Sequence, residues 1–186
     1  MTKKRSTKAR TARANASLSL AEATPKDATT WRAMREEMYG DVPPEFHEAE
    51  MALMLASDDR ACLLVRDPQE EAVGFIEVSL RNVVDGCLGG PVGYIEGIYL
   101  VPSWRGLGLG PAMIDAAATW FRAQGCRDMA TDAEIDNEDA QQFWSELGFE
   151  ETWRVVHYHK PLNGTQPPKR SKSSRPSARK RKSRRG

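Results

Sequence analysis

The chain has 186 residues, with 27 Lys and Arg against 26 Asp and Glu, so its formal net charge at pH 7 is only +1. This length suits one domain with tails, and no apolar run approaches the roughly 20 residues that a membrane-spanning helix needs. The basic N-terminus lacks a following apolar stretch, so we expect neither a secretory signal nor a membrane partner.

The charges are distributed unevenly along the chain. Residues 1–17 carry six Lys or Arg, residues 163–186 carry ten, and neither segment contains an acid. The segment 18–162 keeps 11 basic residues against all 26 acidic ones, a difference of −15. We therefore predict disordered basic arms at 1–17 and 163–186 that flank an acidic globular domain at 18–162. Such a domain attracts cationic small molecules, although acidic charge also serves solubility.

Cysteine and histidine usage limits the chemistry further. Cys62, Cys87 and Cys126 are odd in number and form no CxxC pair, which indicates reduced thiols in a cytoplasmic protein. His157 and His159 share one face of a predicted strand, but no third ligand accompanies them. Because protein metal sites of this kind need three or four ligands, we expect no metal.

The first half of the chain alternates between strand and helix patterns. In chain order, the patterns predict a strand at 18–23, helices at 24–39 and 43–53, and strands at 61–65 and 72–80. Thr24 and Pro25 suit the start of the first helix, and Pro43 and Pro44 begin the second. A glycine-containing hairpin loop at 82–90 then leads to the central strand.

The central strand, 94–101, is apolar on both faces and ends at Pro102. Glu96 is its exception, because a carboxylate inside such a strand costs several kcal/mol unless it is paired, hydrated or facing a cleft. After a glycine-rich loop, the patterns predict a helix from Pro111 to about Gly125, a strand at 127–132, a helix at 136–147 and a last strand at 149–160. The fold class is α/β (α+β), a mixed and mostly antiparallel sheet with helices on both faces. Such a sheet can splay beside its central strand and open a cleft.

The loop after the central strand reads Arg105-Gly106-Leu107-Gly108-Leu109-Gly110, followed by Pro111. Glycines let backbone N–H groups approach a ligand closely, and the start of a helix adds partial positive charge, so the loop suits a pyrophosphate. It is not a Walker loop, which ends in Gly-Lys-Ser/Thr, and its Gly-x-Gly-x-Gly spacing differs from the dinucleotide fingerprint Gly-x-Gly-x-x-Gly.

Arg-x-x-Gly-x-Gly after an apolar strand ending in Val-Pro resembles the acetyl-CoA loop of the GCN5-related N-acetyltransferases. The blocks GFIEVSLR, PVGYIEGIYLVPSWRGLGLG, TDAEIDN and LGFEETWRVVHYHK are similar to the aminoglycoside 6′-N-acetyltransferases within that superfamily. The resemblance covers about 18–160 and implies the acetyltransferase fold, acetyl-CoA as co-substrate, and acetyl transfer to the 6′-amine of an aminoglycoside with resulting antibiotic resistance.

The resemblance also assigns the cofactor contacts. Ile98, Tyr99 and Leu100 would hold the pantetheine arm through their backbone, and Asn137 would contact the cofactor. The pyrophosphate would lie on seven consecutive residues, namely Arg105, Gly106, Leu107, Gly108, Leu109, Gly110 and Pro111. At Trp144 many superfamily members have a tyrosine near the thioester sulfur. Because an indole is no general acid, departure of the thiolate would rely on water or the helix dipole.

The acceptor side would use Tyr39, Glu77, Glu96 and Asp132. Carboxylates can both bind an incoming ammonium and relay its proton, so Glu96 and Asp132 are the candidate catalytic residues. The resemblance further implies a homodimer that uses the last strand. Two alternatives stay open: an acetyltransferase for a polyamine or protein lysine, and a nucleic-acid-associated module with a vestigial acetyl-CoA pocket. The basic arms could contact nucleic acid without base specificity.

Overall fold

The computed structural model describes residues 18–40 and 42–162. Five strands form one sheet in the order β1-β2-β3-β4-β5, where only the β4–β5 pair is parallel. The strands are β1 (Ser19–Glu22), β2 (Arg60–Arg66), β3 (Ala72–Arg81), β4 (Val92–Leu100) and β5 (Met129–Thr131). The helices are α2 (Ala28–Tyr39), α3 (Pro44–Leu55), α4 (Leu109–Ala123) and α5 (Glu138–Glu146), with 3₁₀ turns η1 (Pro25–Asp27) and η2 (Pro102–Trp104).

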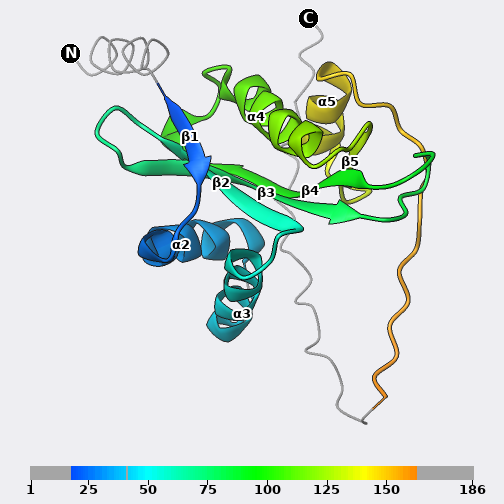
Figure 1. Ribbon diagram of the computed structural model, residues 1–186, viewed down its shortest axis with the longest axis horizontal. Helices are drawn as coiled ribbons and strands as arrows, with labels where there is room; N and C mark the ends of the chain where they lie inside the picture. Colours follow the sequence, from blue (N-terminus) through cyan, green and yellow to red (C-terminus); the bar gives the residue numbers. More distant parts are fainter. Residues whose placement is uncertain (1–17, 41, 163–186) are drawn as a thin grey trace, which may run out of the picture. The chain divides into compact units, whose positions relative to one another are not determined.

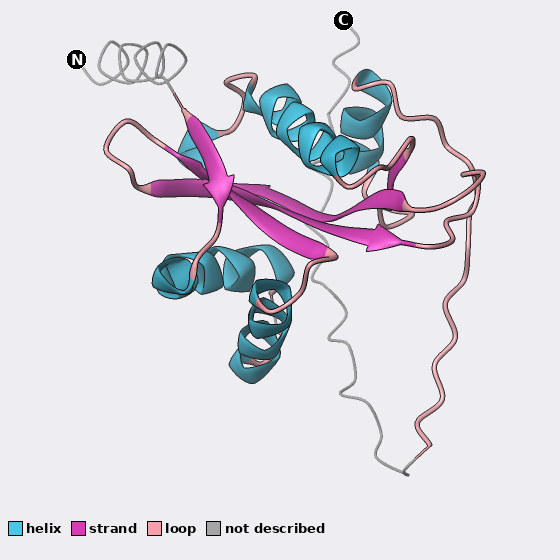
Figure 2. Cartoon of the chain, viewed as in Figure 1, coloured by secondary structure: helices cyan, strands magenta, loops and turns pink. Residues whose placement is uncertain are grey.

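The helices cover both faces of the sheet. Helices α2 and α3 lie on one face, while α4 and α5 lie on the other (Figures 1 and 2). The predicted mixed sheet with helices on both faces is therefore confirmed. None of the described helices combines the length and hydropathy that crossing a membrane requires.

Local sequence explains where the helices begin. The backbone N–H of Thr24 donates to the Asp27 carboxylate at 2.8 Å, which fixes the entry into η1 and α2. Pro44 occupies the first turn of α3, where a missing N–H costs nothing. The Asn137 side chain accepts a bond of 3.1 Å from the N–H of Ala140 and so caps α5.

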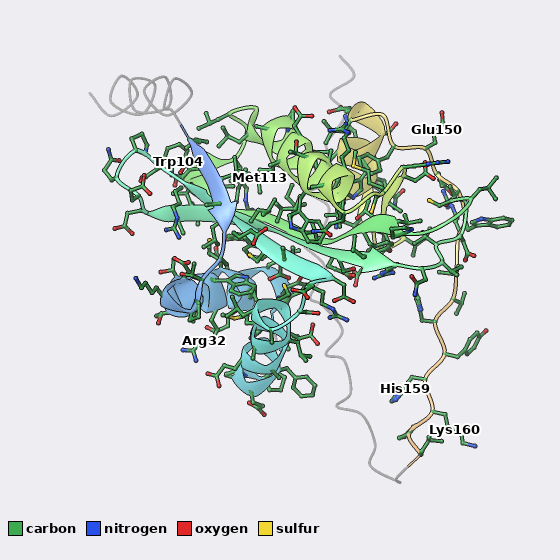
Figure 3. The ribbon with its side chains drawn as sticks, in the orientation of Figure 1. Arg32, Trp104, Met113, Glu150, His159 and Lys160 are labelled. Atoms are coloured by element: carbon green, nitrogen blue, oxygen red, sulfur yellow. The ribbon has the colours of Figure 1, made fainter. Side chains whose placement is uncertain are left out.

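Each face of the sheet has its own core. Under α2 and α3, a cluster built from Trp31, Met34, Leu64, Phe75 and Tyr99 is almost fully buried. Under α4, residues such as Ile76, Ile95, Ala117 and Phe121 form the larger cluster, to which Trp104 and Met113, labelled in Figure 3, also belong. Strands β3 and β4 contribute to both clusters, which explains their nearly continuous apolar sequences.

An irregularity in β4 interrupts the regular strand pairing of the sheet. Glu77 pairs with Gly97 and Val78 pairs with Ile95, so Glu96 is an extra residue in the β4 ladder, a β-bulge. On the other side, β5 pairs with β4 only at Gly93, Tyr94 and Ile95. Beyond the bulge, β4 has β3 as its one strand partner in the described chain. In the described chain the pairing of β4 with β5 therefore ends just before Glu96, beside the central strand where the sheet was predicted to splay.

The prediction of a last strand at 149–160 is wrong for the single chain. No residue of that segment lies in a strand, and all of 150–160 are exposed, including Trp153, Val156 and Tyr158. The contacts within the chain divide it into two compact units, one that ends at Arg154 and one that begins at Val155. An alternating sequence can form a strand only where a partner strand is available. The arms predicted at 1–17 and 163–186 lie outside the described residues.

Candidate active site

A cleft of about 520 Å³ lies on the α2–α3 face of the sheet. Its walls come from the end of α2, from α3 and from the neighbouring ends of β2, β3 and β4. Polar residues dominate the lining, among them Arg35, His47, Glu50, Arg60, Glu77, Ser79, Arg81 and Glu96. The cleft therefore presents both acidic and basic groups next to the bulge in β4.

Glu96 lies at the bulge with several partners. Its Oε1 accepts from the Ser79 hydroxyl at 2.5 Å. The guanidinium of Arg81 contacts both carboxylate oxygens, with Nη2 at 3.0 Å from Oε1 and 2.8 Å from Oε2. The side chains of Arg81 and Glu96 are 41% and 36% exposed. Of the situations that make a strand carboxylate tolerable, pairing and exposure to a cleft both apply to Glu96.

Asp132 is linked to Glu96 through two other side chains. The Cζ of Arg81 lies 3.2 Å from the ring centroid of Tyr94. The Tyr94 hydroxyl in turn donates to Asp132 at 2.5 Å. Burial, followed by this hydrogen bond, raises the pKa of Tyr94, so its hydroxyl stays a donor at neutral pH. Asp132 is exposed just after β5, as its predicted position at a strand end requires.

Glu77 is the carboxylate that is truly buried, with 1% of its surface exposed. It accepts from Arg35 Nη1 at 2.5 Å, from Trp31 Nε1 at 2.7 Å and from the Tyr39 hydroxyl at 3.2 Å. Burial raises the pKa of Glu77, and the Arg35 guanidinium opposes that rise. Three hydrogen-bond donors from α2 thus connect this helix to β3. Because these donors already occupy the Glu77 carboxylate, we expect Glu77 to position the Tyr39 hydroxyl.

Tyr39 and His47 complete the inner wall of the cleft. A Cβ added at Gly97 would lie 2.5 Å from the Tyr39 hydroxyl, so the phenol lies directly against the strand next to Glu96. His47 is 1% exposed, and its Nδ1 accepts from Arg35 Nε at 3.5 Å. Burial and then the Arg35 charge lower the pKa of His47, so its imidazole is neutral at pH 7.

The predicted cofactor residues lie beyond the bulge. Ile98 and Leu100 are partly buried, while the Tyr99 side chain stacks on Phe75 at 5.7 Å within the core. Only the backbone of Tyr99 is therefore placed to contact a ligand. Arg105 Nε donates to the Leu100 carbonyl at 2.6 Å, which joins the glycine loop to the end of β4.

The glycine loop leads directly into α4. Gly108 has a φ of +75° and precedes the first helical residue, Leu109. A side chain at this φ would be strained, although nothing lies within 4 Å of a Cβ built there. Gly110 is needed for another reason, because its Cβ would lie 2.7 Å from the Phe143 ring of α5. The open start of α4 faces no capping side chain and can receive an anion.

The residues that surround the candidate carboxylates were not identified from the sequence. Arg81 and Ser79 lie on the same face of β3 as Glu77, and Tyr94 lies opposite Ser79 in the ladder. The alternation Glu77-x-Ser79-x-Arg81 was a readable signal, since period-two polar residues on a strand share one face. The Arg35 partner of Glu77 carried no such signal, because it comes from a helix more than 40 residues earlier.

Other predicted positions have structural partners of their own. Asn137 caps α5, as described above, which leaves its predicted cofactor contact a prediction. Trp144 is 9% exposed and packs between Phe143 and Phe149 in the α4–α5 core. In the described part of the chain, no three His, Cys, Asp or Glu side chains are grouped so as to hold a metal ion.

Comparison with known proteins gives a consistent result. The sequence model of the acetyltransferase (GNAT) family matches residues 31–149. The aminoglycoside N(6')-acetyltransferase type 1 of Stenotrophomonas maltophilia is 38% identical over 142 residues, which cover 76% of this chain and 92% of that protein. The Serratia marcescens protein of the same name is 39% identical over 133 residues, covering 71% and 91%. The solved structure of AAC(6')-Iy in complex with the bisubstrate analog CoA-S-monomethyl-acetylneamine has a TM-score of 0.74 at 32% identity, covering 78% of this chain and 99% of that one.

Proposed function

This chain belongs to the acetyltransferase (GNAT) family, and we propose that it transfers the acetyl group of acetyl-CoA to the 6′-amine of an aminoglycoside. One observation carries the proposal: the β4 bulge places Glu96 on the wall of the cleft under α2 and α3, while the same strand leads into a glycine loop at the start of α4. Its similarity to proteins named aminoglycoside N(6')-acetyltransferase supports the choice of acceptor. The analog in the AAC(6')-Iy structure supports the choice of donor.

Acetyl-CoA would bind along the half of β4 beyond the bulge. The backbone of Ile98 to Leu100 has no strand partner on one side in the described chain, so the pantetheine arm can add to it as a strand would. The loop from Arg105 to Pro111 and the start of α4 would hold the pyrophosphate. Arg105 lies close to the proposed pantetheine site, because its Nε donates a hydrogen bond to the carbonyl of Leu100, the last residue of β4. Asn137 is the remaining proposed contact.

The acceptor would enter the cleft as an ammonium and react as a neutral amine. Glu96 and Asp132 would bind its positive charge, and Tyr39 would bound the site on the α2 side. Glu96, directly or through water, would accept the proton that the amine loses. The amine nitrogen then attacks the thioester carbonyl and the new C–N bond forms. The nitrogen gives up a second proton to water, and the C–S bond breaks to release CoA as a thiolate, which takes a proton from water. Backbone N–H groups near Leu100 would stabilise the oxyanion.

No side chain in the described site is positioned as an obvious acid for the departing thiolate. Trp144 packs in the core and offers only an indole N–H. We infer that water or the dipole of α4 assists the thiolate, which leaves readily because a thiol is a far stronger acid than an alcohol. Acetylation converts an ammonium on the antibiotic into a neutral amide, and antibiotic resistance is the proposed consequence.

A thiol-release assay tests the proposal. The full chain is incubated with acetyl-CoA and, separately, with neamine, spermidine and a lysine-rich peptide, and free CoA thiol is measured over time. We expect release that depends on neamine and is much slower with the other two amines. Preference for spermidine or the peptide would move the assignment to a polyamine or protein-lysine acetyltransferase. Absence of release with every amine, in a folded protein that binds acetyl-CoA, would contradict the function.

We further propose a homodimer in which residues 149–160 of one copy supply a strand to the sheet of the other. Two observations support this: the segment carries exposed apolar side chains such as Trp153, and β5 has one strand partner in the described chain. Sedimentation of the full chain at micromolar concentration should give the dimer mass. A monomer there would contradict the proposal.

The remaining proposals concern the arms and the location of the protein. We take 18–162 as the catalytic domain and the basic segments 1–17 and 163–186 as arms for non-specific contact with nucleic acid. The free thiols Cys62, Cys87 and Cys126 support a cytoplasmic location.

A further inference from the structure

We propose that the Arg81 guanidinium occupies the site on Glu96 that an acceptor ammonium takes, and that the acceptor must displace it. The exchange makes Arg81 a residue that sets the affinity for cationic acceptors, so that an acceptor needs additional charged groups to bind tightly. This inference rests on the proposed function in one respect, namely that the acceptor of the cleft is a cation.

The surroundings of Arg81 are those of a cation-binding site. Both carboxylate oxygens of Glu96 lie within 3.0 Å of Nη2, and Nε lies 3.3 Å from Oε1. The centroid of the Tyr94 ring lies 3.2 Å from Cζ, an arrangement that attracts any cation. The Ser79 hydroxyl donates to the same Oε1. An alkylammonium could use the same oxygens and the same ring face.

Arg81 is held loosely enough to leave. Both partners of the Arg81–Glu96 pair are more than one-third exposed, and ion pairs this exposed contribute little because water screens them. The cleft contains a contrasting arginine in Arg35, whose side chain is 7% exposed and paired with the buried Glu77. Removing Arg35 from its partner would leave an unpaired buried charge, so Arg35 is a fixed part of the wall while Arg81 is exchangeable.

The exchange has a consequence for acceptor choice. A monoamine that replaces Arg81 substitutes one cation for another at Glu96 and gains little. A polycation gains the same contact and also interacts with further acids of the cleft, such as Glu50. Every cationic acceptor must displace Arg81 at the same cost, so an acceptor with one charge binds weakly. An aminoglycoside, which has several charges, offsets that cost through its further contacts.

A binding experiment tests the site without relying on turnover. Methylguanidinium, a small copy of the Arg81 head group, is titrated by calorimetry into the full-length wild type, Arg81→Ala, and Arg81→Ala combined with Glu96→Gln. We expect binding to Arg81→Ala about tenfold tighter than to the other two, as the loss of a charge-assisted contact predicts. Equal affinity for all three proteins would overturn the proposal. Because acetyl transfer is not measured, the outcome holds whether or not the enzyme acts on aminoglycosides.

Steady-state kinetics then test the exchange. Arg81→Gln should lower the KM for neamine and the KM for a monoamine such as benzylamine by a similar factor, about threefold to tenfold, because the cost of displacing Arg81 is the same for both acceptors. Arg60→Gln is the matched control, since it removes the same charge from the same cleft wall without a contact to Glu96. A smaller effect at Arg60 than at Arg81 supports the exchange. Equal effects at both positions, or a higher KM in Arg81→Gln, would show that Arg81 acts only through cleft charge or as part of the acceptor site.

Discussion

Glu77 and Glu96 lie on the same face of neighbouring strands but differ in their surroundings. Glu77 is 1% exposed and accepts three hydrogen bonds from α2, whereas the side chain of Glu96 is 36% exposed and faces the cleft. A carboxylate with three fixed donors has little capacity left for a substrate, so we expect it to position Tyr39. A carboxylate held by an exposed arginine can exchange partners, which suits binding and proton transfer.

Glu96→Gln and Asp132→Asn test this division of roles, because each keeps the shape and removes the charge. Loss of a charge-assisted hydrogen bond at Asp132 should weaken acceptor binding by about 1.5–3 kcal/mol, or roughly tenfold to a hundredfold. Glu96→Gln should weaken acceptor binding less, because at Glu96 the acceptor only replaces Arg81. If Glu96 accepts the proton, Glu96→Gln should also lower kcat and flatten its rise with pH, while Asp132→Asn should act mainly on acceptor KM. Steady-state kinetics with both substrates measure these effects.

Acetyl-CoA affinity and the melting temperature serve as controls for both variants. Neither should change much, since Glu96 and Asp132 lie at the exposed acceptor side of the bulge. A Glu96→Gln enzyme with unchanged kcat and acceptor KM would remove Glu96 from the mechanism. A lower melting temperature without selective change in acceptor kinetics would make it a structural carboxylate.

His47 gives the fold a dependence on pH. Burial and Arg35 lower its pKa in the folded protein, with Arg32 acting in the same direction and Glu36 opposing it. The unfolded chain, with a histidine pKa of about 6.5, then binds more protons, so stability falls as pH drops through that value. Urea unfolding between about pH 7.5 and 5.5 should show this decline, and His47→Gln should make the curve flatter. An equal slope in both proteins would exclude His47 as the cause.

At the level of elements, the junction between β4 and α4 is the predicted cofactor site. Gly108→Trp should weaken acetyl-CoA binding at least about tenfold by filling the space in front of the helix, with acceptor binding retained. Gly125→Trp is a matched control, because Gly125 has a similar φ of +81° and equally open surroundings but lies at the other end of α4. Calorimetry of both folded variants measures the affinities. Unchanged acetyl-CoA affinity in Gly108→Trp, or equal loss in both variants, would contradict the assignment of the loop.

The elements that the sequence predicted correctly are those whose signal is local. Pro44 and Asn137 mark helix starts by their own chemistry, and β3 and β4 are apolar because both faces are covered. The third helix was predicted from Pro111 but begins at Leu109. The strand predicted at 149–160 failed because its alternation cannot supply a partner. The bulge at Glu96 could not be predicted either, because a bulge depends on the register between two paired strands rather than on the residues of one strand.

The candidate site, like the fold, could be predicted only in part from the sequence. Composition and the glycine spacing predicted an anion-binding loop, and the four candidate acceptor residues do lie in or beside one region of the sheet. Which carboxylate is buried and which is exchangeable depended on Arg35 and Arg81. The position of Arg81 beside the site could be read from the alternation on β3, whereas Arg35 comes from α2 and only the three-dimensional structure could pair it with Glu77.

In the molecule as a whole, we expect the acidic domain 18–162 to keep its activity when the basic arms 1–17 and 163–186 are removed. A truncated protein spanning 18–162 should keep the kcat and KM of the full chain with small acceptors within about twofold, because the described cleft uses residues of that span only. It should lose any salt-sensitive binding to DNA or RNA. Side-by-side kinetics and binding assays at several salt concentrations measure both. A folded but inactive truncated protein would mean that the ends belong to the catalytic unit.

Acetyl transfer to a 6′-amine bound in the cleft under α2 and α3 can be tested with one pair of substrates. Neomycin and paromomycin differ only at the 6′ position, which carries an amine in the first and a hydroxyl in the second. The initial rate of CoA thiol release by the full chain should be high with neomycin and near background with paromomycin, because a hydroxyl is a far poorer nucleophile at neutral pH. Equal rates with the two compounds, or no release with neomycin from a folded enzyme that binds acetyl-CoA, would contradict the account.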